Sequence, residues 1–262
     1  MIYLSNQEKK ISKKFLKQGY VIIKLKELAS LNFIKKKIIF SINNLISDKI
    51  NSHHHLNNIH NKLDLHELNT FRVKLIKDLN STKDFKYHYF NLAREQIYTL
   101  VGNELLMQKN INLSIQFPKD NSSLLPIHSD VWSGDSPFEI NLWVPMVNCY
   151  KTKSMYILPE KNKLYFHELL KKKKIKSSHE MYNLIKKKLI WLKVNYGEVL
   201  IFNQNLPHGN VMNMENETRI SMNCRFKSYF SPFGDKKLGE FFKPITTRAM
   251  TNLGLNYISP FK

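Results

Sequence analysis

The 262-residue sequence is poor in cysteine and arginine and contains no long apolar run. Its two cysteines, Cys149 and Cys224, are too few for a disulfide framework or a thiolate metal cluster. No stretch approaches the ~18 consecutive apolar residues that a transmembrane helix needs. The first residues lack the basic-then-apolar layout of a secretory signal peptide. We therefore expect a reduced, cytoplasmic protein without a membrane span.

Several common catalytic motifs are absent as well. The sequence has no G-x-S-x-G elbow, no phosphate-binding P-loop and no G-x-G-x-x-G dinucleotide fingerprint. Hydrolase, kinase and dehydrogenase functions therefore receive no support. The sequence also lacks an internal repeat and a Pro-, Gly- or Ser-rich linker, so one domain over residues 1–262 is expected. With 42% hydrophobic residues the chain can build a full core, which excludes disorder of the whole chain.

The charge of the chain is strongly one-sided. Lysine and arginine total 41 against 21 acidic residues, and the formal net charge is +20 at pH 7. Only five of the basic residues are arginine, and many of the lysines lie in runs at 35–37, 171–174 and 186–188 that are typical of solvated helix faces. The charge can serve solubility alone, or it can attract nucleic acid, an anionic membrane surface or a phosphorylated substrate. Because phosphate-reading proteins favour the bidentate fork of arginine, the lysine bias argues against nucleic acid.

The first hundred residues carry mainly helical patterns. Residues 5–8 form a capping box, helical spacing of apolar residues follows, and Gly19 is a natural helix end before a strand at 20–25. Helices are also predicted over about 27–47 and about 84–103. The Asn- and His-rich stretch 51–61 is predicted to be a loop. This region, 1–105, is expected to form a helical layer with one strand.

After Lys109 short apolar or β-branched runs alternate with turn residues. The runs predict strands at 111–117, 124–130, 138–148, 154–158, 190–194, 198–202 and 218–230. A lysine-rich segment, 165–189, interrupts them as a helical insertion. The fold class is therefore α+β, with a β-sandwich or barrel behind a helical layer.

Two histidines and an aspartate have the spacing of a metal site. His128 and Asp130 are two positions apart on a predicted strand, so both side chains point to the same face. His208 follows the strand 198–202, and Arg219 opens the next one. Two imidazoles and one carboxylate form the facial triad of non-haem Fe(II) oxygenases, which leaves positions open for a keto-acid cosubstrate. The fork of Arg219 suits the far carboxylate of that cosubstrate.

With these residues in place, the chain resembles the phytanoyl-CoA-dioxygenase-like branch of the Fe(II)/2-oxoglutarate oxygenases. The likeness extends to Gly19–Ile23, to the aromatic-bearing strand Leu142–Met146 and, less closely, to Ser154–Glu160. It covers about residues 10–30 and 110–230. It implies a double-stranded β-helix core (jelly-roll or cupin-like) over 110–230, with 231–262 as a C-terminal extension.

The resemblance also implies roles for single residues. His128, Asp130 and His208 would bind Fe(II), and Arg219 would hold the 5-carboxylate of 2-oxoglutarate. The cosubstrate pocket would also be lined by Trp143 and Asn210. Arg225 is a second candidate for the cosubstrate anchor, because it lies six positions after Arg219 on the same face of a strand. Halogenating relatives have a small residue in place of Asp130, so this carboxylate indicates hydroxylation or another oxidation of a C–H bond.

Three further residues are candidates for substrate binding. Trp132 can stack on a sugar ring, and Asp135 can accept hydrogen bonds from hydroxyl groups. Arg72 is a candidate contact to an anionic substrate from the helical layer. The expected substrate is a small polar molecule, a sugar or nucleotide-sugar of surface polysaccharide biosynthesis. Two alternatives stay open, a nucleic-acid demethylase of the same superfamily and a cupin-like binding protein or isomerase without oxygen chemistry.

A second histidine cluster, His53–His55 with His60 and His66, is a rival metal site. Zinc sites need deliberate spacing and a closed set of four ligands. These histidines lie among asparagines without cysteines, so a solvated loop is the favoured interpretation.

Overall fold

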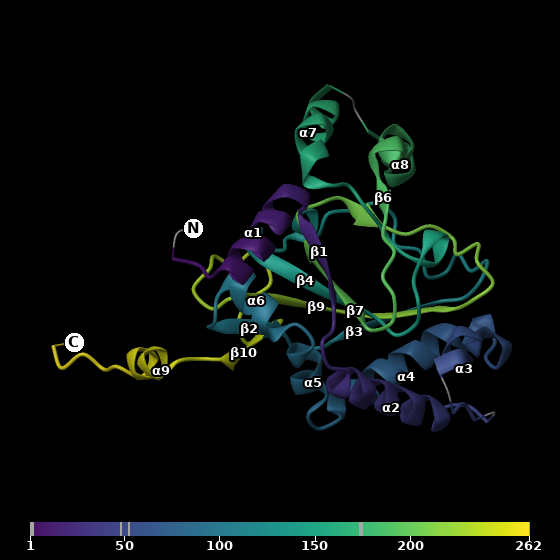
Figure 1. The fold of residues 1–262 in the computed structure, drawn as a ribbon, viewed down its shortest axis with the longest axis horizontal. Helices are drawn as coiled ribbons and strands as arrows, with labels where there is room; N and C mark the ends of the chain where they lie inside the picture. Colours follow the sequence, from purple (N-terminus) through teal and green to yellow (C-terminus); the bar gives the residue numbers. More distant parts are fainter. Residues whose placement is uncertain (1–2, 48, 52, 173–174, 262) are drawn as a thin grey trace.

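A large antiparallel β-sheet forms the centre of the computed structural model, which describes residues 3–47, 49–51, 53–172 and 175–261 (Figure 1). In these residues the sheet has seven strands in the order β1-β7-β4-β9-β2-β10, with β3 also paired to β9. The strands are β1 (Tyr20–Lys24), β2 (Leu105–Gln108), β3 (Asn112–Gln116), β4 (Glu139–Pro145), β7 (Glu198–Asn203), β9 (Arg219–Ser228) and β10 (Phe242–Thr246). A second sheet joins β6 (Ile190–Trp191), β5 (Tyr156–Ile157) and β8 (His208–Gly209).

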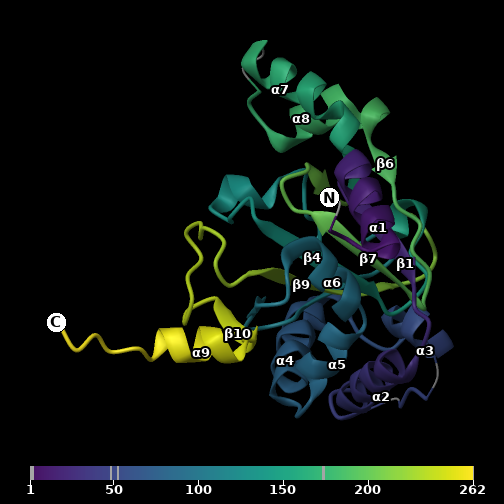
Figure 2. The same ribbon diagram turned by 60° about the vertical axis from the view of Figure 1, so that its left-hand side comes forward.

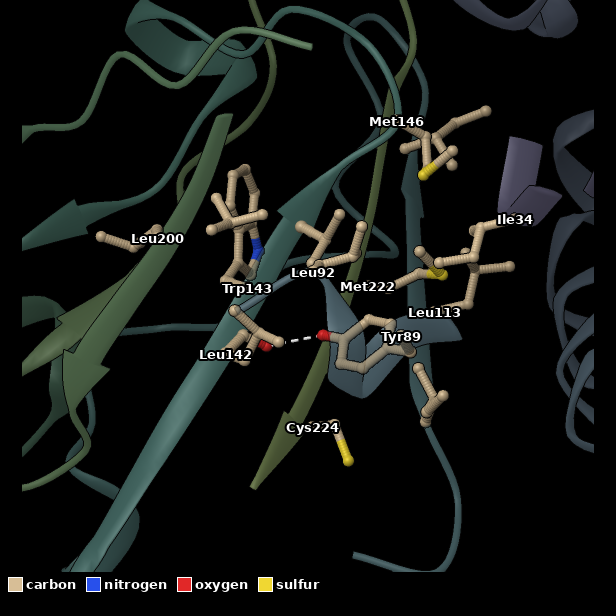
Figure 3. Packing of buried hydrophobic residues seen from close by; sticks show 14 of the residues in the cluster. Ile34, Tyr89, Leu92, Leu113, Leu142, Trp143, Met146, Leu200, Met222 and Cys224 are labelled. Atoms are coloured by element: carbon tan, nitrogen blue, oxygen red, sulfur yellow. Dashed lines mark hydrogen bonds between the residues drawn. The ribbon is translucent and has the colours of Figure 1, made fainter. Parts of the chain in front are cut away.

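Strand β9 separates a polar cavity from the apolar core. Its even-numbered residues from Ile220 to Phe226, among them Met222 and Cys224, are buried in the main hydrophobic cluster. Its odd-numbered residues from Arg219 to Arg225 line the cavity. This division follows from the period of two along a strand, which sends neighbouring side chains to opposite faces. Behind the sheet, the Tyr89 hydroxyl donates a hydrogen bond of 2.7 Å to the Leu142 carbonyl, which ties the helical layer to β4 (Figure 3).

The helical layer packs against the face of the sheet that is turned away from the cavity (Figures 1 and 2). It contains α2 (Ala29–Asn43), α3 (His53–Asn57), α4 (Leu68–Ser81), α5 (Phe85–Asn91) and α6 (Arg94–Val101). Helix α4 was not among the predicted elements, although Phe71, Leu75 and Leu79 form a buried stripe with a spacing of four residues.

Two predictions for this layer were wrong. The stretch 51–61 is not a simple loop, because it contains α3 and the 3-10 turn Ile59–Asn61, with Ile59 buried; residue 52 lies outside the described part. The predicted single helix over 84–103 is two helices, α5 and α6. The chain turns between them at Leu92 and Ala93, whose side chains are buried in the core. In both places tertiary packing overrides the structure that the local sequence pattern favours.

The first helix and strand confirm the capping prediction. In α1 (Asn6–Gln18) the Glu8 amide donates to the Ser5 hydroxyl, and the Ser5 amide donates to the Glu8 carboxylate. Gly19 ends the helix with φ of 78°, a left-handed conformation that favours glycine. Strand β1 then pairs with β7 over its whole length. The amino-terminal segment is therefore anchored on the outer edge of the large sheet.

Two helical segments leave the body of the fold. The predicted insertion contains α7 (Lys163–Lys172) and α8 (Ser178–Ile185), which pack on a small second core through Phe166 and Ile185. At the carboxyl end α9 (Ala249–Leu255) and the residues after it point away from the molecule in both views (Figures 1 and 2). No helix in the described part of the chain combines the length and apolar character needed to cross a bilayer.

Candidate metal centre

His128, Asp130 and His208 meet at one point of the cavity. One ligand atom from each residue lies within 4.8 Å of the other two. His128 and His208 face each other across a narrow antiparallel bridge, with backbone hydrogen bonds of 2.9 and 2.8 Å in the two directions. Because His208 belongs to β8, this bridge adds His128 to the second sheet as a one-residue neighbour of β8. Adjacent strands therefore deliver the two imidazoles to one side.

The predicted strand over 124–130 is only partly present. Within it the structure shows the isolated bridge at His128, and Asp130 already begins the 3-10 helix Asp130–Ser133. Ser129 keeps an extended conformation (φ −124°, ψ 133°), so His128 and Asp130 still point to the same side. Their Nε2 and Oδ1 atoms are 3.6 Å apart. The strand prediction was wrong at this end, because the Asp130 amide bonds to the Gln204 carbonyl instead of a ladder partner.

Backbone carbonyl groups orient both imidazoles. Nδ1 of His128 lies 2.8 Å from the Pro126 carbonyl oxygen, and Nδ1 of His208 lies 2.8 Å from that of Leu206. A carbonyl oxygen can only accept, so each Nδ1 carries the proton. Each Nε2 then presents a lone pair to the cavity, which is the tautomer that a metal-ligating histidine needs.

The residues after His208 hold the other half of the centre in place. A Cβ at Gly209 would lie 2.7 Å from both the Leu125 carbonyl oxygen and the Tyr156 hydroxyl, so this position requires glycine. The Asn210 side chain accepts a hydrogen bond of 2.6 Å from the Leu125 amide. Asn210 also lines the cavity, as does Trp143 on β4. The His-Gly-Asn sequence thus fixes the segment that leads into His128.

Burial and charge set the protonation of the triad. Burial lowers the pKa of His208 to about 4, so its imidazole is neutral near pH 7. Burial also acts to lower the pKa of His128, but the interactions of its protonated ring with the Asp130 carboxylate and the Pro126 carbonyl together outweigh burial and raise that pKa above the usual value. Burial of Asp130 would raise its pKa, yet His128 and the nearby positive charges hold the pKa of this carboxyl well below its usual range. Asp130 is therefore an anion.

Arg225 is tied to the acidic residues of the site. Its Nη2 lies 3.1 Å from Oδ1 of Asp130, and its Nε donates a hydrogen bond of 2.9 Å to Gln204. The same guanidinium lies 3.5 Å from Asp135. Arg225 therefore already has carboxylate partners within the chain.

Arg219 has the opposite environment at the other end of β9. Its side chain is buried, and it donates only to the Ser154 carbonyl (3.3 Å) and the Ser114 hydroxyl (2.9 Å). Within the described residues no carboxylate pairs with it, and its Nε has no hydrogen-bond partner. Burial lowers the pKa of Arg219 to about 10, so it is still a cation at neutral pH. A buried cation without a counter-ion is costly, which makes this end of the cavity complementary to an anion.

The predicted metal and cosubstrate residues line one cavity of about 280 Å³. His128, Asp130 and His208 line it together with Arg219, Arg225, Trp143, Asn210 and Asp135. The remaining lining is mostly amide and hydroxyl: Asn112, Ser114, Ser123, Ser133, Asn141, Ser221 and Asn223. Such a wall offers many hydrogen bonds to a polar ligand.

Two predicted substrate residues lie elsewhere. Trp132 is 48% exposed and stacks on Phe166 of the insertion at 6.0 Å between ring centroids; it does not line the cavity. Arg72 lies on α4 in the helical layer and donates to Asn69, again outside the cavity lining. The structure brings neither side chain to the triad.

The second histidine cluster does not assemble in the described residues. His60 bonds to the Thr218 hydroxyl at 2.8 Å, and His66 lines a separate surface pocket. The only His, Cys, Asp and Glu group with metal-ligand geometry in the described part of the chain is the triad. The side chains of His53 and His54 lie outside the described residues.

Several lining residues were missed in the sequence. The pattern Arg219-Ile-Ser-Met-Asn-Cys-Arg225 alternates polar and apolar residues, and this signal could have identified Ser221 and Asn223 as cavity residues. Lys236, which lines the cavity, and Gln204, which accepts a hydrogen bond from Arg225, could not be identified in this way. Each lies in a segment without a regular alternation of polar and apolar residues.

Solved structures share this fold. The chain is similar to the non-haem monooxygenase ThoJ in its nickel complex (TM-score 0.58, 12% identity, 92% of this chain and 85% of that one). It is also similar to SnoK, a non-haem α-ketoglutarate-dependent carbocyclase from nogalamycin biosynthesis (TM-score 0.53, 12% identity, 94% and 98%). A third match is the epimerase SnoN in complex with Fe³⁺, α-ketoglutarate and nogalamycin RO (TM-score 0.50, 12% identity, 87% and 86%). No known protein-family model and no curated protein matches the sequence. The chain therefore has a mixed helix and antiparallel-sheet fold shared with non-haem oxygenases.

Proposed function

We propose that the protein is an Fe(II)- and 2-oxoglutarate-dependent oxygenase. The observation that carries the proposal is the buried, unpaired guanidinium of Arg219 in the same cavity as the His128, Asp130 and His208 triad. A metal triad alone suits many reactions. A triad with a buried cation at the far end of its cavity suits a metal-chelating dicarboxylate, and 2-oxoglutarate has that chemistry.

The residues fit both groups. Each imidazole is held with Nε2 free, and Oδ2 of Asp130 is buried without a hydrogen-bond partner. These are the donors that Fe(II) takes in a facial triad. At the other end, the Nε of Arg219 and the hydroxyls of Ser154 and Ser221 are also buried without partners. A carboxylate bound there would accept the hydrogen bonds that these groups lack.

The architecture supports a double-stranded β-helix core in one domain. The seven-stranded and the three-stranded sheet both contribute residues to the cavity, as the two sheets of a jelly roll do. Strands β1 and β10, from the two ends of the chain, belong to the same sheet. The helices α7 and α8 are then an insertion between core strands.

The protein's part in the reaction is to bind and orient. Iron with 2-oxoglutarate and O₂ supplies the oxidising power when bound. Arg219 fixes the cosubstrate tail, and the imidazoles and Asp130 fix the metal. Trp143 and Phe202 keep one wall of the cavity apolar and exclude water. Asp130 would be a metal ligand where halogenating relatives have a small residue, so we expect hydroxylation or another C–H oxidation.

For the substrate we propose a small polar molecule, a sugar or a nucleotide-sugar of surface polysaccharide biosynthesis. The amide- and hydroxyl-rich wall supports this choice, because it matches the hydrogen-bonding capacity of hydroxyl groups. Asp135 is a lining residue and stays a candidate for that role. Trp132 would take part only if the insertion moved.

Turnover of the cosubstrate tests this function. Purified protein with Fe(II), ascorbate and 2-oxoglutarate should form succinate, and a matching sugar or sugar nucleotide should raise the rate. The Asp130→Asn variant should form none above the metal-only background. If no member of a broad carbohydrate panel raises the rate of succinate formation, the carbohydrate substrate loses its support.

The two alternatives are separated by the same assay. A nucleic-acid demethylase should form succinate faster when methylated oligonucleotides are added; the net charge of +20 and the pair Arg219 and Arg225 favour this alternative. Trp132, the exposed aromatic nearest to the triad in sequence, is stacked on Phe166, which leaves it a poor platform for a base. A cupin-like isomerase or binding protein would use the metal without consuming 2-oxoglutarate. That function would not explain why Arg219 is buried in the cavity without a carboxylate partner among the described residues.

A further inference from the structure

Lys236 reaches the metal cavity from a loop outside the core strands. It lies in the segment 229–241 between β9 and β10, and it is one of the residues that line the cavity. Its ammonium nitrogen lies 3.2 Å from Oδ2 of Asp135 and 4.8 Å from the centre of the Phe241 ring. Two contacts from different directions thus fix the position of its charge.

The loop is packed closely against the segment that carries the metal ligand. The Asp235 amide donates a hydrogen bond of 2.7 Å to the Gly134 carbonyl, four residues after Asp130. A Cβ at Gly234 would collide with that same carbonyl oxygen, so the two backbones can approach only because position 234 is glycine. Lys236 is therefore held by the same backbone contact that supports the metal centre.

Among the described residues three cationic side chains line the cavity, and they differ in accessibility. Arg219 is 4% exposed and lies six residues from Arg225, about 20 Å along a regular strand. The Arg225 side chain is 13% exposed and is engaged by Asp130 and Gln204. The Lys236 side chain is 29% exposed, which makes it the cation that an incoming molecule can reach.

The charge of the cavity is not balanced. Two lining carboxylates, Asp130 and Asp135, face the three cations. A divalent metal adds two positive charges and a dicarboxylate cosubstrate removes two, so one positive charge remains in the loaded site. Arg225 lies against Asp130, and Arg219 is the proposed partner of the cosubstrate. Lys236 shares its carboxylate partner, Asp135, with Arg225, so its charge is only partly neutralised. An anionic ligand group beside Lys236 would neutralise it.

We propose that Lys236 forms an anion subsite that selects substrates carrying a phosphate or carboxylate group next to the hydroxylated part that enters the cavity. Asp135 is a positioning residue, because it holds the ammonium over the cavity. The subsite rests on the proposed oxygenase function and adds to it a charge requirement on the substrate. Neutral sugars are then poor ligands, whatever their ring geometry.

The test uses three probes that share one ring: glucose 1-phosphate, glucuronate and glucose. Binding to the protein loaded with Fe(II) and 2-oxoglutarate is measured anaerobically by calorimetry at 0.15 M salt. We expect at least one charged probe to bind about ten-fold more tightly than glucose, the effect of a single charge-assisted hydrogen bond. Lys236→Gln should abolish the difference. Lys237→Gln is the matched control, because Lys237 is exposed and donates only to the Gly234 carbonyl; it should keep the difference.

The outcomes separate the sources of the anion. Preference for glucose 1-phosphate identifies phosphate, and preference for glucuronate identifies carboxylate. Equal binding of the three probes to the wild type, or an unchanged preference in Lys236→Gln, overturns the proposal. If Lys236→Gln instead weakens 2-oxoglutarate binding, measured by titrating the absorbance of the metal chelate, Lys236 holds the cosubstrate and the proposal is also overturned. Failure of the proposed oxygenase function gives a different result, because the wild type itself would then show no absorbance of the metal chelate. In that case binding of the three probes to the metal-free protein still tests the role of Lys236.

Discussion

The Nη2 atom of Arg225 lies 3.1 Å from Oδ1 of Asp130, whereas Arg219 on the same face of β9 contacts no carboxylate within the described residues. The two arginines therefore have different tasks. Arg225 compensates the charge of a metal-ligand carboxylate and of Asp135. Arg219 is left with unfilled hydrogen-bonding capacity, which supports its proposed role as the cosubstrate anchor.

Replacing Arg219 should weaken cosubstrate binding without removing the metal. Hydrogen bonds to a charged group contribute about 1.5–3 kcal/mol, so Arg219→Met should raise the Kd of 2-oxoglutarate about 10- to 100-fold. Fe(II) binding, measured by equilibrium dialysis, should change little. The exposed Arg94 supplies the control Arg94→Met, which should leave both affinities unchanged. An unchanged Kd for 2-oxoglutarate in Arg219→Met would show that this arginine is not the anchor.

Replacing Arg225 should destabilise the metal-free protein. Arg225→Met leaves Asp130 and Asp135 with less compensation, and breaking such a buried pair costs about 3–5 kcal/mol. A divalent metal supplies positive charge at Asp130 and should recover part of the loss. The measurement is thermal unfolding in EDTA and in excess Ni(II), for the wild type and the variant. Weaker stabilisation of the variant than of the wild type by Ni(II) would show that Arg225 does not compensate the charge of Asp130.

A buried ion pair next to the Arg219 pocket should respond unequally to loss of its two partners. Lys153 is fully buried and donates to Glu217 at 2.6 Å and to Asn57 at 2.7 Å. Glu217→Gln leaves a buried ammonium without an anion and should lower the free energy of unfolding by about 3 kcal/mol. Lys153→Met leaves a carboxylate that reaches solvent and should cost clearly less. Urea denaturation measures both, and equal losses would contradict this explanation.

Both thiols should be unreactive in the folded protein. Cys149 and Cys224 are free and fully buried, and burial raises the pKa of Cys149 to about 12 and that of Cys224 further. Since the thiolate is the reactive form, a thiol reagent such as DTNB should react slowly at pH 8. Two thiols per chain should react at once in guanidinium chloride. Rapid native labelling of either cysteine would show that β9 or its neighbours are not packed as described.

The residues of the site could be predicted from the sequence more completely than the elements of the fold. His128, Asp130, His208 and Arg219 were identified from spacing and strand context, and the structure places them in one cavity. The end of the predicted strand at 130 was wrong without consequence, because one extended residue is enough to align His128 with Asp130.

Long-range packing explains what the sequence did not reveal. The Thr218 amide donates a hydrogen bond to the backbone carbonyl of Asn57 in α3, so a stretch that looks like a polar loop is fixed against the segment that leads into β9. Lys236 comes to the triad only because Gly134 and Gly234 allow two backbones to touch. Trp132 was predicted to face the substrate, yet α7 offers it Phe166 instead. None of these contacts has a local periodicity that a sequence pattern can report.

The visible spectrum of the protein under anaerobic conditions reports directly on whether the triad binds Fe(II) together with 2-oxoglutarate. Fe(II) is added first and 2-oxoglutarate second, to the wild type and to His208→Gln, which keeps most of the side-chain volume but loses the imidazole lone pair. We expect a weak charge-transfer band that saturates at one equivalent of each in the wild type and is absent from the variant. No band in the wild type, or a band of equal intensity in His208→Gln, would contradict this expectation.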